Sequence, residues 1–503
     1  MSSTVIPHQP DDPIPPAATG DPRSSGGEQE LHRGQLFDLR FYVLLAAVLL
    51  SRIPLMSNGY GSDPDAWRVA DVAHTLVETG TYAVSRFPGY PLHELICAGP
   101  IALAGSWGSN GATLLCGLIS IVVFHLLARE HLRHAGFATI CLAFAPLFWV
   151  NSAATMDYVW SLLFVLLAIR MAVKARATMT GMMIGIAAGF RPSNFIMVVP
   201  IAILLILADR SVRRVLWMGV LAVVSGIVVF LPVFLTYGVG GWLTRSEEQI
   251  AGFSSSLLDS TLFAGYRAVY SIGPLAAICI ASLLVLRWRV LVQLLNRREP
   301  MITMSLSALT LSAVLFFAIP AERGYLLAAL PFLLILVDAT ATRNWMIGIT
   351  VAMISFAFVN PDVIMHTTFI GRPGFNIREG MVVQEINQRK EIFYRRTYLT
   401  SHPPPAPAVV MTGTGPVFWV ENDQVQPVFG QSVNDLRDIT VMLRSNDKIH
   451  YTPMLSRNEV DSTLAAGTDV WCVSDLQEYI ENSEHYRMQD AHVSILSVPP
   501  YNR

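Results

Sequence analysis

Ionisable side chains gather in a polar segment near the N-terminus, residues 57–110, which separates two apolar runs. A carboxylate there can accept a proton as a general base, and a guanidinium can bind an anion through paired donors. His93 and Glu94 lie in an otherwise apolar stretch, where ionisable groups are often functional, although such a pair costs little at the headgroup level. Six side chains of the segment could take part in chemistry: Asp63, Asp65, Arg86, Tyr90, His93 and Glu94.

The two aspartates also fit the start of a helix, so a structural role competes with a chemical one. Asp63 suits an N-cap with Pro64 at the first helical position, and Gly80 suits the C-terminal end. Asp65 falls in the first turn, where the helix dipole favours a carboxylate. We therefore expect a helix between Asp63 and Gly80, with both interpretations open for each acid.

Four further ionisable side chains flank apolar runs later in the chain: Asp157, Arg191, Glu322 and Arg323. Asp157 could cap a helix or contact an acceptor or a metal ion. An arginine near the membrane surface can extend its charge to lipid headgroups, and Arg191 could instead bond the carbonyls that Pro192 leaves free. Glu322 beside Arg323 could form a surface ion pair.

Length and composition indicate a membrane protein with a soluble tail. Of the 503 residues, 52% are apolar and 14% are charged, against about 25% charged in ordinary soluble proteins. Charged residues are sparser between 37 and 360 than beyond. The net charge of −2 excludes a nucleic-acid binder that relies on a broad basic surface. The five cysteines lack metal-binding spacing, so neither a zinc module nor a disulfide framework is expected.

Apolar runs predict an all-α polytopic membrane bundle of about eleven transmembrane helices. The runs are 37–56, 111–128, 136–150, 157–173, 179–190, 193–208, 214–235, 271–288, 302–319, 325–341 and 344–359. The break at 191–192 could also mark one kinked helix. Lys and Arg predominate in alternate loops, which places the N-terminus in the cytoplasm and the C-terminus outside. This orientation requires residues 91–108 to lie at the interface without crossing.

The chain is expected to have four parts. Residues 1–36, rich in Pro, Ser, Gly and acids, form a disordered cytoplasmic tail. Residues 37–360 form the transmembrane domain, with 57–110 as its first outer loop. Residues 361–407 form a helical linker with a Pro-rich hinge, and 408–503 a small α/β extracytoplasmic domain. The elements expected after 360 are a helix over 377–399, strands over 408–411, 470–473 and 493–498, and helices over 457–466 and 475–482.

The first outer loop resembles that of the GT-C superfamily of integral-membrane glycosyltransferases, which includes protein O-mannosyltransferases and lipid A aminoarabinose transferases. The family pattern is an acid, a small residue, a leucine, a glycine and an aromatic residue. Here these are Asp65, Ala73, Leu76, Gly80 and Tyr82. Many relatives carry a glutamate directly after the acid, where this chain has Ala66.

Three later stretches are also similar to the family. They are residues 88–91 (Pro-Gly-Tyr-Pro), 189–193 (Gly-Phe-Arg-Pro-Ser) and 322–331 (Glu-Arg-Gly-Tyr-Leu-Leu-Ala-Ala-Leu-Pro). In the last stretch, Gly324 is inserted before Tyr325 relative to the family pattern. The resemblance covers roughly residues 40–340 and leaves the tail uncovered.

The resemblance implies inverting transfer of a sugar from a polyprenyl-phosphate donor to an acceptor hydroxyl at the outer membrane face. A carboxylate would accept the hydroxyl proton, with Asp65 the first candidate and Asp63 the second. Arginines would bind the departing phosphate. The candidates for that role are Arg323, Arg86 and Arg191. The candidates for other substrate contacts are His93, Glu94, Asp157, Tyr90 and Glu322.

Partners and location follow from the same resemblance. The acceptor would be a protein, a lipid or a polysaccharide, and the site would be the outer face of a bacterial inner membrane. No metal-ligand spacing is present, so no metal site is assigned. Some branches of the family need a divalent cation, so that cofactor is left open.

Two other functions fit a multi-spanning chain. One is a transporter or flippase, which would show internal repeats or charges on broken helices. The other is a non-catalytic membrane assembly protein that works through its outer domain. The spans hold few acids, and the ionisable residues gather in the outer loops. This distribution favours catalysis at the outer face.

Overall fold

The computed structural model describes most of the helical part of the chain and parts of the tail. The described residues are 38–251, 257–318, 323–364, 374–413, 417, 449–452, 455, 457–474, 476 and 493–501. Residues up to Ala47 and residues from Val48 onward form two separate units, and every contact given below lies within the second. The predicted disordered tail lies outside the described residues.

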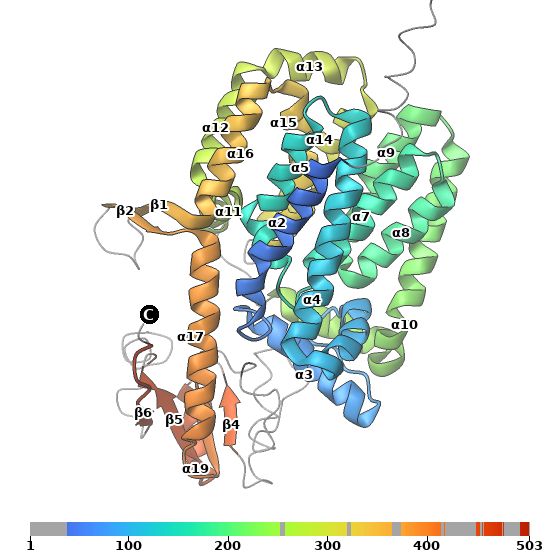
Figure 1. The fold of residues 1–503 in the computed structure, drawn as a ribbon. Helices are drawn as coiled ribbons and strands as arrows, with labels where there is room; N and C mark the ends of the chain where they lie inside the picture. The colour runs from blue at the N-terminus through green and yellow to red at the C-terminus, as the bar shows by residue number, and fades with distance from the viewer. Residues whose placement is uncertain are drawn as a thin grey trace, which may run out of the picture. The chain divides into compact units, whose positions relative to one another are not determined.

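Helices make up most of the described chain (Figure 1). The longer ones are α2 (Leu39–Met56), α3 (Pro64–Thr79), α4 (Pro91–His131), α7 (Tyr158–Val173), α8 (Ala177–Phe190), α10 (Val212–Ala251), α11 (Leu257–Ile272), α12 (Pro274–Leu286), α14 (Pro300–Ala318), α16 (Arg343–Phe358) and α17 (Met381–Ser401). The shorter ones are α5 (Ala135–Phe144), α6 (Pro146–Asn151), η1 (Pro192–Met197), α9 (Val198–Asp209), α13 (Trp288–Asn296), η2 (Arg323–Leu327), α15 (Leu330–Thr340) and α19 (Arg457–Ala465). The expectation of a mostly helical chain is confirmed.

Two breaks between helices can be compared with the apolar runs, of which the first divides a predicted run and the second agrees with a predicted break. The run 136–150 is divided into α5 and α6, because Pro146 lacks the N–H that a continuous helix would need. The break at 191–192 separates α8 from α9 through the short helix η1, so it is not a kink within one helix.

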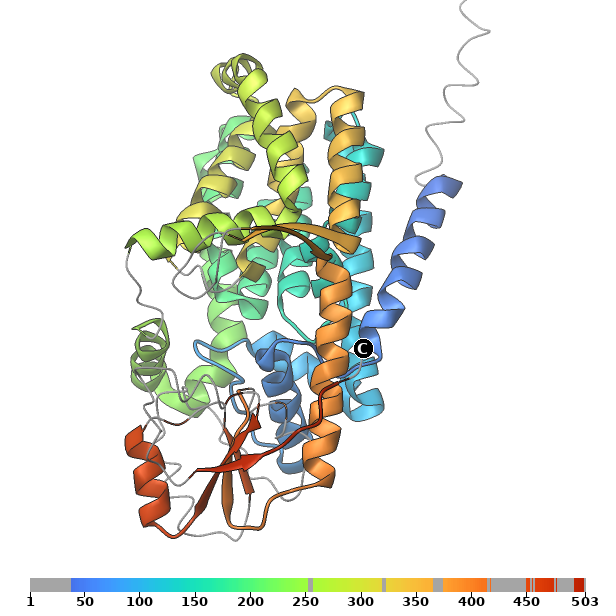
Figure 2. The same cartoon turned by 90° about the vertical axis from the view of Figure 1, so that its left-hand side faces the viewer.

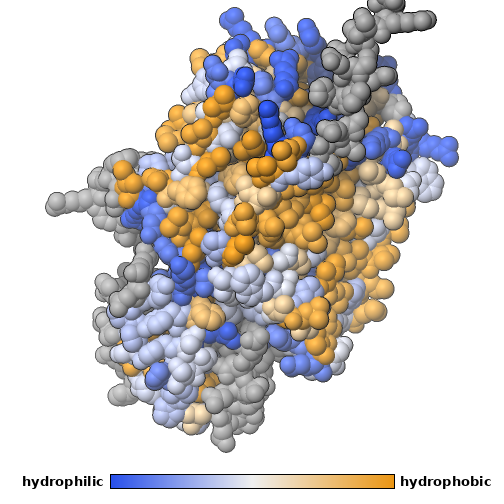
Figure 3. All heavy atoms as spheres, in the orientation of Figure 1, coloured by the Kyte–Doolittle hydropathy of each residue, from blue (hydrophilic) through white to orange (hydrophobic). Residues whose placement is uncertain are grey.

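Among the described residues, four helices are long and apolar enough to cross a membrane. They are Leu39–Met56, Pro91–His131, Val212–Glu247 and Pro300–Ala318. A fifth crossing is added if the bent pair Ala264–Ile272 and Pro274–Leu286, which meet at 97°, forms one span. Six shorter apolar helices accompany them. The count of eleven spans and the direction of the termini therefore stay predictions. Apolar residues cover much of the helical part of the surface in the view of Figure 3. The exposed apolar side chains of the protein include Leu216, Val228 and Leu235 of α10.

The helix α4 is broken near one end. Ala104 and Gly105 leave the helical conformation, and Gly105 has a positive φ of 55°. A Cβ on Gly108 would collide with the carbonyl oxygen of Pro100, so only glycine fits the bend. The segment before the break corresponds to the non-crossing stretch expected over 91–108, and its place at the interface stays a prediction.

A row of glycines brings α8 against α10 (Figure 1). Gly181, Gly185 and Gly189 recur every four residues along one face of α8. A Cβ at Gly185 would overlap the hydroxyl of Ser225 in α10, and one at Gly189 would overlap Val229. Small residues at this spacing allow close backbone approach between membrane helices. The packing fixes the end of α8, where Arg191 begins the turn into η1.

The segment after α16 folds as a hairpin followed by a helix. Strands β1 (Val359–Ile364) and β2 (Gly374–Glu379) pair antiparallel, with Val359 opposite Glu379. The helix α17 follows β2 directly (Figure 2). The predicted helix over 377–399 is therefore wrong at its start, because the residues before Gly380 are held in the ladder with β1.

A parallel sheet follows α17. Strands β3 (Ala408–Met411), β4 (Ile449–Thr452), β5 (Asp469–Val473) and β6 (Ser494–Leu496) lie in the order β4-β3-β5-β6. Three of these strands overlap the strands expected from sequence, and α19 overlaps the expected helix over 457–466. The expected helix over 475–482 falls mostly outside the described residues. Whether residues 408–503 form a separate domain stays a prediction.

Candidate active site

The acidic end of α3 is built as its sequence predicts. An Asp63 oxygen accepts a hydrogen bond from the Asp65 backbone N–H at 2.9 Å, Pro64 opens the helix, and Gly80 closes it in the left-handed region. The capping interpretation of Asp63 is therefore confirmed. This leaves Asp65 as the first-turn carboxylate whose side chain turns to other partners.

Asp65 pairs with two arginines. An Asp65 oxygen lies 3.0 Å from Nε of Arg86, and the other lies 3.4 Å from Nη1 of Arg68, one turn further along α3. The Asp65 side chain keeps 16% of its surface exposed. It is therefore held in place while part of it still faces outward.

Asp157 joins two guanidinium groups from distant segments. One Asp157 oxygen lies 2.9 Å from Nη2 of Arg86, and the other lies 2.7 Å from Nη1 of Arg191. All three side chains are buried. Asp157 makes no side-chain capping bond to α7. The capping interpretation is therefore wrong, because the carboxylate is fully used by the two arginines.

Arg191 lies inside the protein, not at a lipid headgroup. Its Cζ lies 3.9 Å from the ring centroid of Tyr158 and 4.3 Å from that of Tyr325. A Cβ at Gly324 would overlap the Tyr158 ring. The inserted Gly324 thus allows η2 to approach Tyr158 and to place Tyr325 over the guanidinium. The interpretation of Arg191 as a snorkelling side chain is wrong for this reason.

Arg86 also lies against an aromatic ring. The guanidinium Cζ lies 3.9 Å from the ring centroid of Tyr90, the residue that precedes α4. Burial raises the pKa of Tyr90, so the ring is a neutral π surface for the cation. Burial alone disfavours the charge on Arg86, but Asp65 and Asp157 outweigh it and raise the pKa of its guanidinium.

Among the described residues, three arginines of this cluster share two carboxylates. The arginines are Arg68, Arg86 and Arg191, and the carboxylates are those of Asp65 and Asp157. Within the part of the chain that the structure describes, Nη1 of Arg86 is buried with no hydrogen-bond partner. A buried donor without a partner costs free energy, and an incoming anion would satisfy it. The cluster is thus suited to bind an anionic group beside a partly exposed carboxylate.

Glu94 fixes the loop that carries Arg86. It accepts hydrogen bonds from the Tyr82 hydroxyl at 2.6 Å and from both the backbone N–H and the hydroxyl of Ser85 at 2.7 Å. His93 lies one position earlier, with Nε2 3.4 Å from the Cys97 sulfur. These contacts give Glu94 a positioning role, and a direct substrate contact for either residue stays a prediction.

Arg323 and Glu322 are two further residues that the sequence predicts for the site. Arg323 begins η2, half-buried, with its Cζ 5.6 Å from the ring centroid of Tyr270. The salt bridges found among the described residues do not include Arg323. Glu322 lies outside those residues. A phosphate contact by Arg323 is therefore still a prediction.

Three members of the site were not predicted from the sequence. Arg68 has no partner visible in the sequence beyond its spacing of three from Asp65. Tyr158 and Tyr325 each stand next to a predicted feature, namely Asp157 and the stretch 322–331. Their aromatic side chains beside these predicted features were the signal from which they could have been identified.

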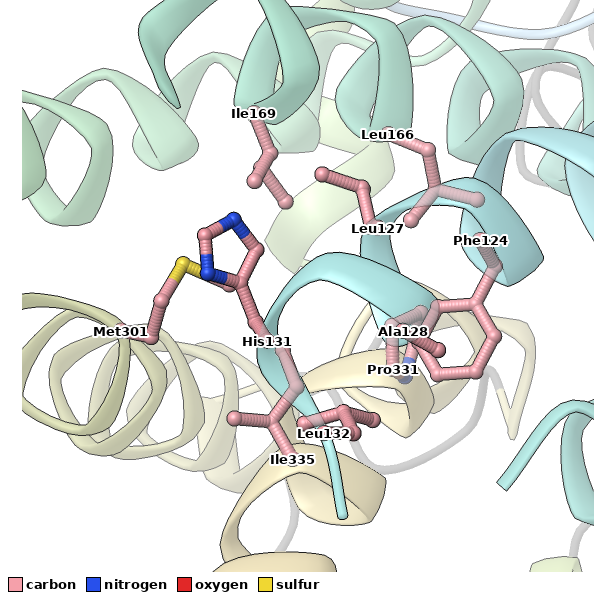
Figure 4. A pocket seen from close by; sticks show the side chains of 10 residues that line it. All are labelled: Phe124, Leu127, Ala128, His131, Leu132, Leu166, Ile169, Met301, Pro331 and Ile335. Atoms are coloured by element: carbon pink, nitrogen blue, oxygen red, sulfur yellow. The ribbon is translucent and has the colours of Figure 1, made fainter. Parts of the chain in front are cut away.

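A metal site or a pocket near the cluster could also contribute to the chemistry. Among the residues that the structure describes, no three His, Cys, Asp or Glu side chains are placed to hold a metal ion. The described residues therefore provide no set of ligands for the divalent cation that the sequence left open. A small, mainly apolar pocket lies elsewhere, between α4, α7, α14 and α15 (Figure 4). None of the candidate site residues lines it.

Comparisons with known proteins give two structural matches. One is the crystal structure of ArnT from Cupriavidus metallidurans bound to undecaprenyl phosphate, with 16% identity and a TM-score of 0.45. That match covers 59% of this chain and 59% of the other. The apo structure of the same protein matches with 16% identity and a TM-score of 0.40, over 85% of this chain and 94% of the other. No family model and no curated protein matches.

Proposed function

We propose that this chain is a GT-C-type glycosyltransferase that moves a sugar from a polyprenyl-phosphate donor to an acceptor hydroxyl. The observation that carries the proposal is the ion-pair chain in which Arg86 bridges the partly exposed Asp65 to the buried Asp157. It places a proton acceptor and a cation with an unused donor next to each other. Sugar transfer from a phosphate needs both groups at one centre.

Asp65 is the general base in this proposal. The acceptor oxygen attacks the anomeric carbon on the face opposite the phosphate, and its proton passes to an Asp65 oxygen. The bond between the anomeric carbon and the phosphate oxygen breaks, and the electron pair leaves with the phosphate. Asp65 suits the role because its side chain is 16% exposed, whereas that of Asp157 is 1% exposed and bound on both oxygens.

Arg86 and Arg191 are the phosphate-binding groups in this proposal. Their aromatic stacking and shared Asp157 fix both guanidiniums before a ligand arrives, so little reorganisation is needed. A phosphate oxygen would accept from Nη1 of Arg86, the donor that neither carboxylate uses. The contact between Nε of Arg86 and Asp65 can then persist, so one guanidinium holds the base beside the phosphate.

The finer parts of the proposal come from the sequence. The outer membrane face and the bacterial inner membrane follow from the distribution of Lys and Arg and from the family resemblance. The acceptor is a protein, a lipid or a polysaccharide. Asp63 is the second catalytic candidate, although its oxygen is engaged at the start of α3.

The test compares two asparagine variants of neighbouring acids. Purified protein in detergent is offered mannosyl, glucosyl and related polyprenyl-phosphate donors, with and without cell-envelope extract as a source of acceptor. Asp65→Asn should lower kcat about 100- to 10,000-fold, the usual contribution of a general base. Asp63→Asn is the matched control, because asparagine also caps a helix.

Two outcomes would change the proposal. Turnover that survives in Asp65→Asn and disappears in Asp63→Asn would move the base to Asp63. Absence of both turnover and donor binding in the wild-type protein would overturn the glycosyltransferase proposal and favour a transporter or an assembly protein.

A further inference from the structure

A buried arginine of α17 binds two backbone segments that flank the candidate site. Arg389 is fully buried, with 0% of its surface exposed. Its Nη1 donates to the carbonyl oxygen of Leu55 at 2.5 Å and to that of Ala153 at 2.7 Å. Leu55 lies two residues before the predicted first outer loop, and Ala153 stands four residues before Asp157. One guanidinium thus links the chain segment that precedes Asp65 to the segment that precedes Asp157.

Glu385, one turn earlier in α17, extends this tie to the acidic start of α3. Its Oε1 accepts from Nε of Arg389 at 2.7 Å, and its Oε2 accepts from the Ser62 hydroxyl at 2.8 Å. Ser62 directly precedes Asp63, the cap of the helix that carries Asp65. The ion pair therefore holds three segments of chain that are far apart in sequence.

The two loops also bond to each other directly. The Thr155 backbone N–H donates to the Tyr60 carbonyl at 2.8 Å. The Asn110 amide group donates to the Gly59 carbonyl at 3.0 Å and accepts from the Thr155 hydroxyl at 2.9 Å. These bonds connect the loops laterally. The Glu385–Arg389 pair on α17 ties both loops to the part of the chain beyond residue 380. Arg396 of the same helix adds a contact to the first loop, with its Cζ 5.3 Å from the Trp67 ring centroid.

A buried charge keeps its geometry more strictly than an apolar contact would. Removing one member of a buried ion pair leaves the other charge uncompensated, so Arg389 and Glu385 are held to one arrangement. Sugar transfer depends on the placement of the base relative to the phosphate site, and small displacements there are costly. The pair is therefore placed to control a distance on which the chemistry depends.

We propose that Glu385 and Arg389 are positioning residues, which set the place of Asp65 relative to Arg86 and Asp157 through Ser62 and the two backbone carbonyls. Neither side chain contacts the cluster itself in the structure. This inference rests on the proposed function for its catalytic consequence. Its geometric content, that α17 orders the two loops, stands apart from it.

The kinetic test uses the Ser62–Glu385 hydrogen bond, because Ser62 is only half-buried and its change spares the core. Ser62→Ala should lower kcat about tenfold with KM for the donor unchanged, since misplacement of the base weakens the transition state and not donor binding. Ser62→Thr keeps the hydroxyl and should restore most of kcat. In the double variant Ser62→Ala with Glu385→Gln, kcat should equal that of Glu385→Gln alone, because both changes break one coupled unit.

A matched control exists on the same helix. Glu391 and Arg395 form an i,i+4 pair on α17 with 3.7 Å between their charged atoms, and the Glu391 side chain is 41% exposed. Glu391→Gln should leave kcat and KM unchanged. A kcat loss of equal size in Glu391→Gln, or losses that simply multiply in the double variant, would overturn the positioning role.

A second readout needs no activity. Hydrogen exchange in the full-length protein should speed up in peptides over 57–65 and 151–157 for Glu385→Gln, and stay at the wild-type rate for Glu391→Gln. If the wild-type protein shows neither turnover nor donor binding, the proposed function fails, and this exchange pattern alone decides whether α17 orders the loops. Unchanged exchange in Glu385→Gln would overturn the inference even if the enzyme is active.

Discussion

An oxygen of Asp157 lies 2.7 Å from Nη1 of Arg191, and both side chains are buried. The second oxygen of Asp157 is held by Arg86 at 2.9 Å. The loop before α7, the end of α8 and the loop before α4 therefore meet at one carboxylate. Its loss would affect both the stability of this junction and the placement of the two arginines.

Asp157→Asn should destabilise the protein by about 3–5 kcal/mol, because it leaves two buried guanidiniums without their shared counter-charge. Denaturant or thermal unfolding in detergent would measure the change. Asp461→Asn is the control, since the exposed Arg457–Asp461 pair has a 3.1 Å contact and should contribute at most about 1 kcal/mol. Equal effects of the two variants would contradict the structural weight given to Asp157.

Arg86→Gln should weaken binding of a polyprenyl-phosphate donor at least about tenfold, which corresponds to about 1.4 kcal/mol. The reason is the loss of a buried charge whose Nη1 is available to an anion. Arg323→Gln should weaken binding less, because Arg323 lies outside the ion-pair cluster. Titration with a labelled donor, with folding checked by thermal melting, would compare them. A larger effect at Arg323 would move the phosphate site toward η2.

Asp71 predicts a dependence of stability on pH. It is buried in α3, and desolvation raises the pKa of its carboxyl from 3.8 to about 7. Because the folded-state pKa is raised, the folded protein binds this proton more tightly than the unfolded chain. The free energy of unfolding therefore falls as pH rises from about 4 to about 7 and then levels off.

The matching variant is Asp71→Asn, which removes the titration. It should be more stable than the wild-type protein above pH 7, by at most about 4 kcal/mol, and should lose that advantage below pH 4. Thermal melting of both proteins across this range measures the difference. A difference in Tm that does not vary with pH would show that Asp71 does not titrate as described.

The outer placement of the site is tested by labelling in intact cells. A single cysteine at Thr81, which is exposed in the first outer loop, should react with a membrane-impermeant maleimide. A single cysteine at Ser211, between α9 and α10, should react only after the membrane is opened. Labelling of both positions from outside would refute the orientation, and with it the proposed outer-face chemistry.

The sequence by itself determined the features that depend on neighbouring residues. The helix α3 begins after Asp63 and ends at Gly80 as predicted, because capping and the left-handed glycine act within one turn of the chain. The strand Ala408–Met411 was likewise visible as a short apolar run. The limits of α17 were less visible, because its start depends on the pairing of β2 with β1.

Only the tertiary structure decided which charges meet. Asp157 stands 71 residues from Arg86 and 34 from Arg191 in the chain, and no local pattern links them. Ser62 and Glu385 are separated by 323 residues, yet they share a hydrogen bond. Local rules fix where an element begins and ends, whereas buried charges choose partners from any segment that the packing brings near. The acids and arginines could therefore be named from the sequence, and their pairing could not.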